Sequence, residues 1–554
     1  MKRFFNIFLL ILFSISLFSQ PVPKDWMHKD ISEGYYGVSA HKAYQELLKD
    51  RDGREIIVAV IDSGVDIEHE DLYQNIWVNA DEIPGNGIDD DENGYIDDIH
   101  GWNFIGGPDG SHVAGETLEV TRLYASLRGK YEGVNPLELS DKEKVEYAYF
   151  MHYKKEVESN REKAQASLDK IEPLYTMVND AMAALDAKVE KEYLSLEDLE
   201  SIVSSERNIL IGKSVFTQIL QDEGADSLNV SETVEMIKNE TEEEMNQFKV
   251  RTDYQYNPDF DARATIVKDD YSNSKEKYYG NNDVEGPDPM HGTHVAGIIA
   301  AIRGNDVGMD GIATNVKIMS IRTVPDGDER DKDVANAIRY AVDNGASIIN
   351  MSFGKSYSWD KDIVDDAVKY ADKNDVLLVH AAGNDGKNND EEDNFPNDSY
   401  NKQGFFLCKK KNPKAWIEVG ALSYIQGENL PASFSNYGSE SVDIFAPGVS
   451  IYSTITDNNY RYLPGTSMAS PVVAGVAAVL RSYFPTLKAE QVKEILLKSV
   501  SAIDLEVRRP GDGELVPFSE LSTSGGVVNL YNAVQLAMKT KGKKKIKKEK
   551  KPRV

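Results

Sequence analysis

Short apolar runs rich in β-branched residues recur along this chain and constrain its fold more than any other feature. The first run, residues 55–61, reads Glu-Ile-Ile-Val-Ala-Val-Ile, and similar runs occur at residues 316–321, 346–351, 376–381 and 417–421. A near-continuous apolar run is typical of a strand that is buried on both faces of a parallel sheet. Helix-forming stretches at residues 333–344 and 360–374 separate some of these runs. The alternation predicts an α/β fold with a doubly wound, mostly parallel sheet.

The amino-acid composition changes between residues 116 and 251, where charged, helix-forming sequence replaces the apolar runs. Ser140 with Glu143, and Ser195 with Asp198, have the spacing of helix capping boxes. We therefore expect a large all-helical insertion at residues 116–251, which divides the α/β domain into residues 55–115 and 252–538. Because the insertion lacks strong heptads, a solvated hairpin or bundle is favoured over a coiled-coil dimer.

Both ends of the chain carry segments that we expect to lie outside the α/β domain. Residues 1–20 have the basic start, the apolar run and the small polar end of a secretory signal peptide, so we expect export to the periplasm, the outer envelope or the extracellular space. An uncleaved N-terminal anchor is the alternative. A short N-terminal segment follows at residues 21–54. Residues 539–554 hold ten Lys or Arg and one Glu, which predicts a disordered basic tail, either bound to anionic envelope components or solvated without a partner.

Charge and cysteine content exclude some functions. The formal net charge of −30 repels phosphate backbones, so we do not expect a nucleic-acid partner. Cys408 is the only cysteine, which permits no intrachain disulfide, and we interpret it as an incidental free thiol. An exported chain without disulfides must be stabilised by its hydrophobic core or by bound metal.

Three short glycine-containing motifs supply the groups of one reaction. Asp62, in Ile-Asp-Ser-Gly, ends the first predicted strand and so lies at the carboxyl edge of the sheet, where α/β folds bind their ligands. His291, in His-Gly-Thr-His, and Ser467, in Gly-Thr-Ser-Met-Ala-Ser-Pro, each precede an Ala-rich helix. An aspartate that orients, a histidine that takes a proton and a serine that attacks are the parts of nucleophilic acyl transfer.

These motifs, in the order Asp, His, Ser, resemble those of the subtilisin-like serine proteases, the subtilase family. The resemblance covers residues 55–112 and 285–535. It implies that Asp62 orients, His291 acts as the general base and Ser467 is the nucleophile. It also implies that Asn384, in Ala-Ala-Gly-Asn-Asp after the run at 376–381, donates to the oxyanion of the tetrahedral intermediate.

The same resemblance assigns residues that would contact a polypeptide substrate: Ser352, Phe353, Gly354, Ala382 and Gly383. It implies a preference for an apolar or aromatic side chain before the scissile bond, with Phe353 as a residue that could narrow that pocket. Two further histidines need other interpretations. His294 is expected to be a packed structural residue, and His112 imitates the histidine motif but lacks the apolar helix that must follow it.

Two groups of oxygen-bearing side chains predict structural Ca²⁺. The first group has the spacing of positions 1, 3, 5 and 9 of an EF-hand loop and consists of Asp89, Asp91, Asn93 and Asp97. Position 12 is His100 instead of Glu, so a solvated acidic turn is the alternative. The second group, Asp71 with Asn305, is implied by the family resemblance alone.

The sequence departs from the family pattern in two places. Asp62 and His291 are 229 residues apart because the insertion lies between them, and residues 21–54 are short for an inhibitory propeptide. We expect a secreted or periplasmic serine endopeptidase that acts on polypeptides. The alternatives are an envelope binding or scaffold protein on the same fold and a dedicated processing protease. The insertion is either a gate for large substrates or a docking platform.

Overall fold

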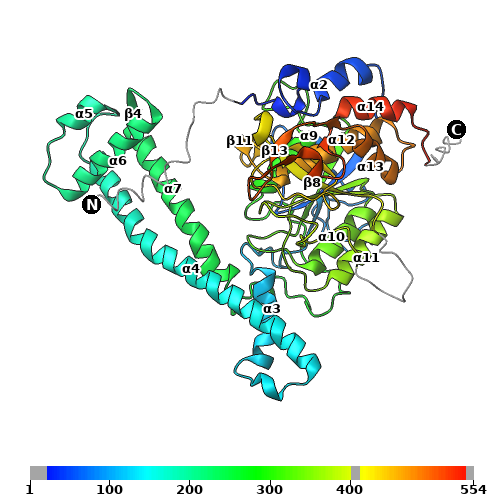
Figure 1. The fold of residues 1–554 in the computed structure, drawn as a ribbon, viewed down its shortest axis with the longest axis horizontal. Helices are drawn as coiled ribbons and strands as arrows, with labels where there is room; N and C mark the ends of the chain where they lie inside the picture. Colours follow the sequence, from blue (N-terminus) through cyan, green and yellow to red (C-terminus); the bar gives the residue numbers. More distant parts are fainter. Residues whose placement is uncertain (1–21, 401–411, 544–554) are drawn as a thin grey trace. The chain divides into compact units, whose positions relative to one another are not determined.

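A nine-stranded sheet forms the centre of the larger of two units in the computed structural model, which describes residues 22–400 and 412–543 (Figure 1). The larger unit, here called the sheet unit, comprises the described residues up to Ala114 and from Arg263 onward, and residues 115–262 form a separate helical unit. The strand order is β12-β15-β9-β8-β7-β6-β1-β5-β2. The strands are β1 (Ile56–Asp62), β2 (Gly101–Asn103), β5 (Val316–Arg322), β6 (Ile348–Met351), β7 (Leu377–Ala381), β8 (Trp416–Leu422), β9 (Ile444–Pro447), β12 (Ser501–Ala502) and β15 (Gly526–Val527).

The sheet confirms the prediction of a doubly wound, mostly parallel α/β fold. Every neighbouring pair is parallel except β12 with β15, which is antiparallel. The five predicted runs form β1, β5, β6, β7 and β8. Strands β2 and β5, which follow β1 in the chain, lie on one side of it, and β6 lies on the other, so the direction of winding reverses around β1. Ligand sites of open α/β sheets lie at such a reversal, beyond the carboxyl ends of the strands.

Helices cover both faces of the sheet. The longer helices of this unit are α9 (Met290–Ala300), α10 (Asp331–Asp343), α11 (Lys361–Lys373), α12 (Thr466–Tyr483), α13 (Ala489–Lys498) and α14 (Leu530–Lys539). Val58 and Val60 of β1 join one apolar core with α9, α12, α13 and α14. Ala59 and Ile61 point to the other face and are equally buried, where α10 and α11 lie (Figure 1). Burial on both faces explains why the strands are near-continuous apolar runs.

Residues 22–54 are part of this core. The segment contains two 3₁₀ turns, η1 (Trp26–His28) and η2 (Ile31–Glu33), a short helix α2 (Ala40–Ala43) and a π-helical turn η3 (Tyr44–Leu48). Trp26 is fully buried, and its indole Nε1 donates to the Ser450 carbonyl at 2.9 Å. Val38 accepts a backbone hydrogen bond from Leu530 of α14. The N-terminal segment therefore stabilises the sheet unit directly.

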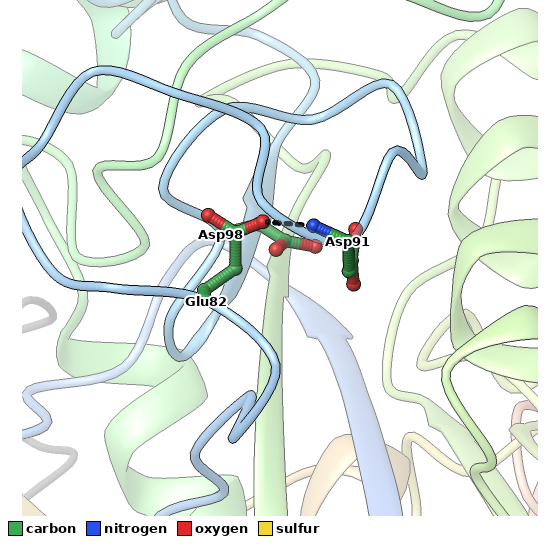
Figure 2. A group of neighbouring side chains, drawn as sticks. All are labelled: Glu82, Asp91 and Asp98. Carbon is green, nitrogen blue, oxygen red and sulfur yellow. Dashed lines mark hydrogen bonds between the residues drawn. The ribbon is translucent and has the colours of Figure 1, made fainter.

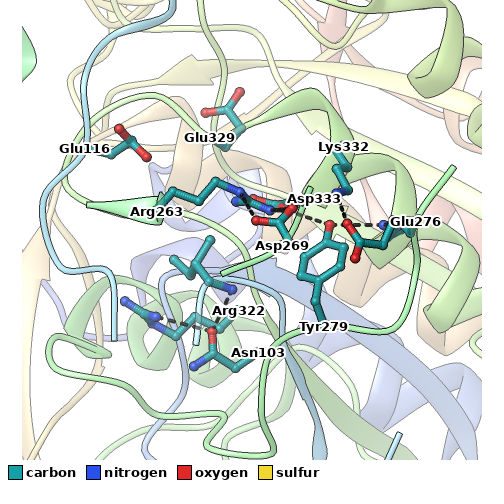
Figure 3. A network of polar contacts seen from close by, with 12 residues as sticks. Asn103, Glu116, Arg263, Asp269, Glu276, Tyr279, Arg322, Glu329, Lys332 and Asp333 are labelled. Atoms are coloured by element: carbon teal, nitrogen blue, oxygen red, sulfur yellow. Dashed lines mark hydrogen bonds and ion pairs between the residues drawn. The ribbon is translucent and has the colours of Figure 1, made fainter. Parts of the chain in front are cut away.

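A buried ionic network holds the chain where it re-enters the sheet unit (Figure 3). Arg263, at the start of α8 (Arg263–Ile266), donates to Asp269 at 2.8 Å and to Asp333 of α10 at 2.6 Å. Lys332 donates to Asp269 and to Glu276 at 2.6 and 2.7 Å. Arg263 and Lys332 together lower the pKa of Asp269, although its burial acts in the opposite direction. The network fixes the segment between α8 and α9 to α10.

The helical unit is a bundle around one long helix. Its elements are α3 (Glu119–Tyr131), η5 (Pro136–Glu138), α4 (Asp141–Asp186), β3 (Tyr193–Ser195), α5 (Leu196–Ser201), α6 (Arg207–Glu223), β4 (Ser227–Asn229), α7 (Val230–Val250) and η6 (Arg251–Gln255). Both predicted capping boxes are present, at the starts of α4 and α5. Helices α3, α6 and α7 pack on α4, which agrees with the predicted bundle.

Two details of the predicted insertion are wrong. It is not entirely helical, because β3 and β4 pair as a short antiparallel ladder. It also extends beyond residue 251 to residue 262. The carbonyl of Gln255 accepts from the Leu118 amide at 3.0 Å and from the Thr121 hydroxyl at 2.7 Å, so the returning chain closes the base of the unit.

The C-terminal prediction also needs a correction. Lys539 ends α14, and the main chain of Lys541 and Lys543 bonds the Gln491 side chain, so the predicted tail begins later than residue 539. The remainder of that tail, the signal peptide at 1–20 and Cys408 lie outside the described residues. Within residues 22–400 and 412–543, no helix has both the length and the apolar content required to span a bilayer.

Two small hairpins complete the sheet unit. They are β10 (Ile451–Ile455) with β11 (Asn459–Leu463), and β13 (Glu506–Arg508) with β14 (Leu515–Pro517). The first hairpin directly precedes α12 in the chain and packs on α9. The hairpin therefore connects the segments that carry the predicted histidine and serine motifs, at the starts of α9 and α12.

Candidate active site

Asp62 and His291 meet at the carboxyl end of β1. Asp62 is 2% exposed, and one of its oxygens accepts both the Ser63 amide at 2.8 Å and His291 Nδ1 at 2.7 Å. Gly64 has φ +127°, and a Cβ on Gly292 would overlap the Gly64 carbonyl. The glycines that follow the aspartate and the histidine therefore allow the two motifs to approach closely.

The environment of His291 favours a proton on its ring. Burial disfavours the charged imidazolium, but the charge and hydrogen bond of Asp62, with a smaller contribution from Asp288, outweigh burial and raise the pKa of His291 above its usual value. The side chain is 37% exposed, so it remains accessible from solvent. With Nδ1 held by Asp62, Nε2 is the ring nitrogen left to exchange a proton with a substrate group.

Ser467 lies in the first turn of α12 and exchanges hydrogen bonds with Ser352. Its hydroxyl donates to the Ser352 carbonyl at 3.0 Å, and the Ser352 hydroxyl donates to the Ser467 carbonyl at 2.8 Å. No hydrogen bond joins Ser467 to His291 among the described residues. Catalytic hydrogen bonds are often long without substrate. A nucleophilic role for Ser467 would require its hydroxyl to give up the bond to the Ser352 carbonyl.

Asn384 follows β7 and is held by Thr466, a residue to which the sequence analysis assigned no role. The carboxamide oxygen of Asn384 accepts the Thr466 amide at 2.9 Å and the Thr466 hydroxyl at 3.0 Å. Because a backbone N–H can only donate, these contacts identify Oδ1 and leave Nδ2 to donate elsewhere. Thr466 precedes Ser467, so an exposed amide donor is fixed relative to the predicted nucleophile, as an oxyanion hole requires.

The predicted substrate-contacting residues lie on two segments. Ser352, Phe353 and Gly354 follow β6, and Ala382 and Gly383 follow β7. The Phe353 ring packs edge-on against the ring of His380, 6.3 Å away between centroids. His380 is fully buried and pairs with Glu418 at 3.0 Å. Burial raises the pKa of Glu418, and His380 opposes that change.

The other two histidines considered from sequence lie elsewhere. His294 is fully buried, with Nε2 at 3.1 Å from the Ile451 carbonyl and 3.0 Å from the Arg461 carbonyl. Burial lowers the pKa of His294 to about 4, as expected of a neutral structural histidine. The Nε2 atom of His112 is 3.1 Å from Asp283. His291 alone among these three contacts Asp62.

The acidic loop gathers a different set of carboxylates from the one predicted. Glu82, Asp91 and Asp98 each have an oxygen within 4.8 Å of the others, and Figure 2 shows the three side by side. Asp89 instead accepts the backbone amides of Asn93 and Gly94, and Asp97 accepts those of Asn86 and Gly87. Asp89 and Asp97 therefore stabilise turns of the loop, and Asp91 is the one predicted carboxylate within the cluster.

Asn93 contacts this cluster through its amide nitrogen. Its Nδ2 donates to Asp91 and to Asp98 at 3.0 and 3.1 Å. Burial raises the pKa of Asp98 to about 6 in spite of hydrogen bonds from Tyr340, Asn79 and Asn93. Of the cluster residues, Glu82 and Asp98 were missed by the sequence analysis.

Asp71 and Asn305 are in contact. Asn305 Nδ2 donates to one oxygen of Asp71 at 2.7 Å, and the Met309 amide donates to the other at 3.2 Å. Burial raises the pKa of Asp71. The second predicted oxygen-donor group is thus assembled from distant parts of the chain.

Comparison with known proteins supplies the family. The model of the subtilase family (Peptidase_S8) matches residues 53–531. The "Thermophilic serine proteinase" of Bacillus sp. (strain AK1) is 38% identical over 41% of this chain and 49% of its own length. "Subtilisin DY" of Bacillus licheniformis is 38% identical over 37% of this chain and 68% of its own length. The "Cell wall-associated protease" of Bacillus subtilis (strain 168) is 36% identical over 43% of this chain and 24% of its own length.

The alignment with the first of these relatives thus spans about half of that protein's length. The family match, in contrast, includes β1, α9 and α12 with the three motifs, and both substrate-contacting segments. The chain belongs to the subtilase family.

Proposed function

We propose that the protein is a serine endopeptidase that cleaves polypeptides through an acyl-enzyme. The observation that carries the proposal is the contact of 2.7 Å between buried Asp62 and His291 of α9, together with a serine in the first turn of α12, a helix that packs on α9. In this mechanism Ser467 Oγ attacks the scissile carbonyl carbon while its proton passes to His291 Nε2. Asp62 stays ionised, holds the ring by Nδ1 and stabilises the imidazolium.

The remaining steps return the enzyme to its starting state. Asn384 Nδ2 and a backbone amide near Ser467 donate to the oxyanion. His291 gives its proton to the leaving amine, which breaks the peptide bond and leaves the acyl group on Ser467. A water molecule then loses a proton to His291 as its oxygen attacks the acyl carbon. The bond between that carbon and Ser467 Oγ breaks, Oγ takes the proton back from His291, and the carboxylic acid product leaves.

The test compares the wild-type protein with Ser467→Ala on casein. Wild type should digest casein and the variant should not, because removal of the nucleophile leaves only the weak acceleration supplied by binding and the oxyanion hole. Circular dichroism checks that the variant is folded. Equal digestion by both proteins would reject the proposal.

Structural Ca²⁺ is part of the same proposal. The donors at Glu82, Asp91 and Asp98 are carboxylate oxygens, the ligands that Ca²⁺ prefers, and two of these residues are largely buried. When bound, the ion would neutralise carboxylates that otherwise repel one another. Asp71 with Asn305 is the second candidate. In both groups amide nitrogens now bond these oxygens, so ion binding would require Asn79 and Asn93 to turn in the first group and Asn305 in the second.

Export is likewise proposed. It rests on the signal-peptide pattern at residues 1–20, and one relative is named a cell wall-associated protease. Binding of the basic tail to anionic envelope components remains a prediction from sequence. Salt-sensitive binding to anionic vesicles that disappears when residues 544–554, beyond the bonds of Lys541 and Lys543 to Gln491, are deleted would support it.

A further inference from the structure

A buried arginine lies beside Asp62 in the sheet. Arg322 ends β5, where it is paired with Asp62 at the end of β1, and it is 2% exposed. Among the described residues, no carboxylate forms an ion pair with its guanidinium. Burial lowers the pKa of Arg322 to about 10, although the charges of Asp283 and Asp288 oppose that change. A buried cation without an ion pair lowers stability, so a role other than packing is indicated.

The guanidinium donates to acceptors from three segments of the chain. Its Nε donates to the Ser63 carbonyl at 2.8 Å, and its Nη2 donates to the Val113 carbonyl at 2.7 Å. Its Nη1 donates to Asn103 Oδ1 at 3.3 Å (Figure 3). A Cβ added to Gly286 would lie 2.2 Å from Nε, so the chain at residue 286 packs directly on the guanidinium. The planar fork of an arginine is thus fixed between the turn after β1 and its neighbours.

The orientation of Asp62 depends on Ser63. One oxygen of Asp62 accepts the Ser63 amide and His291 Nδ1, and the other has no hydrogen-bond partner among the described residues. Ser63 is held by its carbonyl, which accepts from Arg322, and by its hydroxyl, which donates to the Asp288 carbonyl at 3.0 Å. Ser63 therefore links Arg322 to the contact between Asp62 and His291.

We propose that Arg322 is a positioning residue, whose Nε–H fixes the Ser63 carbonyl so that the Ser63 amide aims the Asp62 carboxylate at His291. Arg322 bonds neither Asp62 nor His291 through its side chain, so it acts through Ser63. Its donor is ionised, and such a hydrogen bond is stronger than one between neutral groups. The inference rests on the proposed endopeptidase activity and adds to it a residue outside the three motifs.

Two substitutions at this position separate the hydrogen bond from the charge. A lysine has a methylene group where the arginine has Nε, so Arg322→Lys keeps the positive charge and loses the bond to Ser63. A glutamine has its amide nitrogen where the arginine has Nε, so Arg322→Gln keeps a donor to Ser63 and loses the charge. If Arg322 acts by positioning, the lysine variant should be the more damaged of the two.

The first measurement is the kinetics on a peptide nitroanilide. In Arg322→Lys, kcat should fall about 10- to 100-fold with KM little changed, the factor that corresponds to one hydrogen bond from a charged donor. In Arg322→Gln, the fall should be smaller, about 2- to 5-fold, because a neutral donor still holds Ser63. A larger loss in Arg322→Gln than in Arg322→Lys would overturn the proposal, since it would show that the charge is what matters.

The pH profile distinguishes positioning from a purely structural role. Asp62 raises the pKa of His291, and a looser contact between them raises it less. His291 must be neutral to act as the base, so the acid limb of the profile should move to lower pH in Arg322→Lys. The charge of residue 322 is the same in both proteins and does not contribute to this shift.

Proton NMR gives a measurement that needs no turnover. The proton that His291 Nδ1 donates to Asp62 should resonate far downfield in the wild-type protein, because the carboxylate oxygen lies only 2.7 Å from the nitrogen. This signal should move upfield or broaden in Arg322→Lys and stay in place in Arg322→Gln. Activity that persists in Ser467→Ala would refute the proposed function, whereas this signal tests the role of Arg322 separately.

Arg481→Lys is the matched control. Arg481 is also a buried arginine, 1% exposed, whose pKa is lowered by burial, and it donates to the Asp375 carbonyl at 3.1 Å. It lies near the other end of α12 from Ser467. The control should keep the wild-type kcat, acid limb and downfield signal, even if its midpoint of thermal unfolding falls.

Circular dichroism checks that each variant is folded. Should Arg322→Lys not fold, Arg322→Met, which also has a carbon in place of Nε, takes its part in the comparison with Arg322→Gln. A folded variant without the Nε donor that keeps the wild-type kcat, acid limb and NMR signal would overturn the proposal. An equal loss of kcat in Arg481→Lys would also overturn it.

Discussion

Removal of the Thr466 hydroxyl should weaken the oxyanion donor without touching the nucleophile. Thr466→Val keeps the shape of the side chain and the backbone amide bond to Asn384 Oδ1. It deletes the hydroxyl bond to Asn384 at 3.0 Å and also the bond at 3.2 Å that the hydroxyl accepts from the Gly383 amide. A neutral hydrogen bond contributes about 0.5–1.5 kcal/mol net. If this bond serves to orient Asn384, kcat should fall by about 2- to 13-fold. Asn384→Ala should cost more, about 10²–10³ in kcat, the size of loss seen when subtilisin loses such a donor.

The assay for Thr466→Val separates kcat from KM on a peptide nitroanilide. The loss should appear in kcat with KM little changed, because the oxyanion exists only after attack. Ser470→Ala is the control, since Ser470 is a buried hydroxyl of the same helix that donates to Asn350 at 2.9 Å and does not touch Asn384. An unchanged kcat in Thr466→Val, or an equal fall in Ser470→Ala, would contradict the role assigned to Thr466.

Three further changes test other parts of the account. In Asp62→Asn, kcat/KM should fall by about 10⁴. The acid limb of the pH profile of the residual activity should move to lower pH, because Asp62 raises the pKa of His291, which must be neutral to act as the base. An acid limb that does not move would be evidence against the pairing of Asp62 with His291. EDTA should lower the midpoint of thermal unfolding of wild type, by an amount equivalent to about 2.7 kcal/mol for an ion present at a hundred times its Kd. The decrease should be smaller in Asp98→Asn. Equal midpoints with and without EDTA in wild type would exclude the metal sites. Replacement of residues 115–262 by a Gly/Ser linker should speed digestion of casein more than that of a small peptide if the helical unit is a gate. Equal effects on the two substrates in a folded variant would favour docking.

The sheet was predictable because its central strands must be apolar on both faces. The five runs correspond to strands whose residues alternate between two buried layers, as Ala59 and Val60 do in β1. Strands β2, β12 and β15 were not predictable, since two or three residues carry no usable period. The core role of residues 22–54 was also invisible, because Trp26 and Val38 contact residues more than 400 positions away.

The motifs predicted the reacting side chains but not what holds them. Thr466 lies inside the serine motif, yet its partner Asn384 is 82 residues away. In the acidic loop, spacing alone could not distinguish carboxylates that bind backbone amides, such as Asp89, from those that form the cluster, such as Asp98.

Labelling by a fluorophosphonate tests the central claim most directly, because the reagent forms a bond only with an activated serine. The purified protein should gain one adduct, and mass spectrometry of its peptides should locate that adduct on Ser467. Labelling should disappear in Ser467→Ala and slow strongly in His291→Ala. A folded wild-type protein that gains no adduct, or an adduct on another residue that persists in Ser467→Ala, would contradict the account.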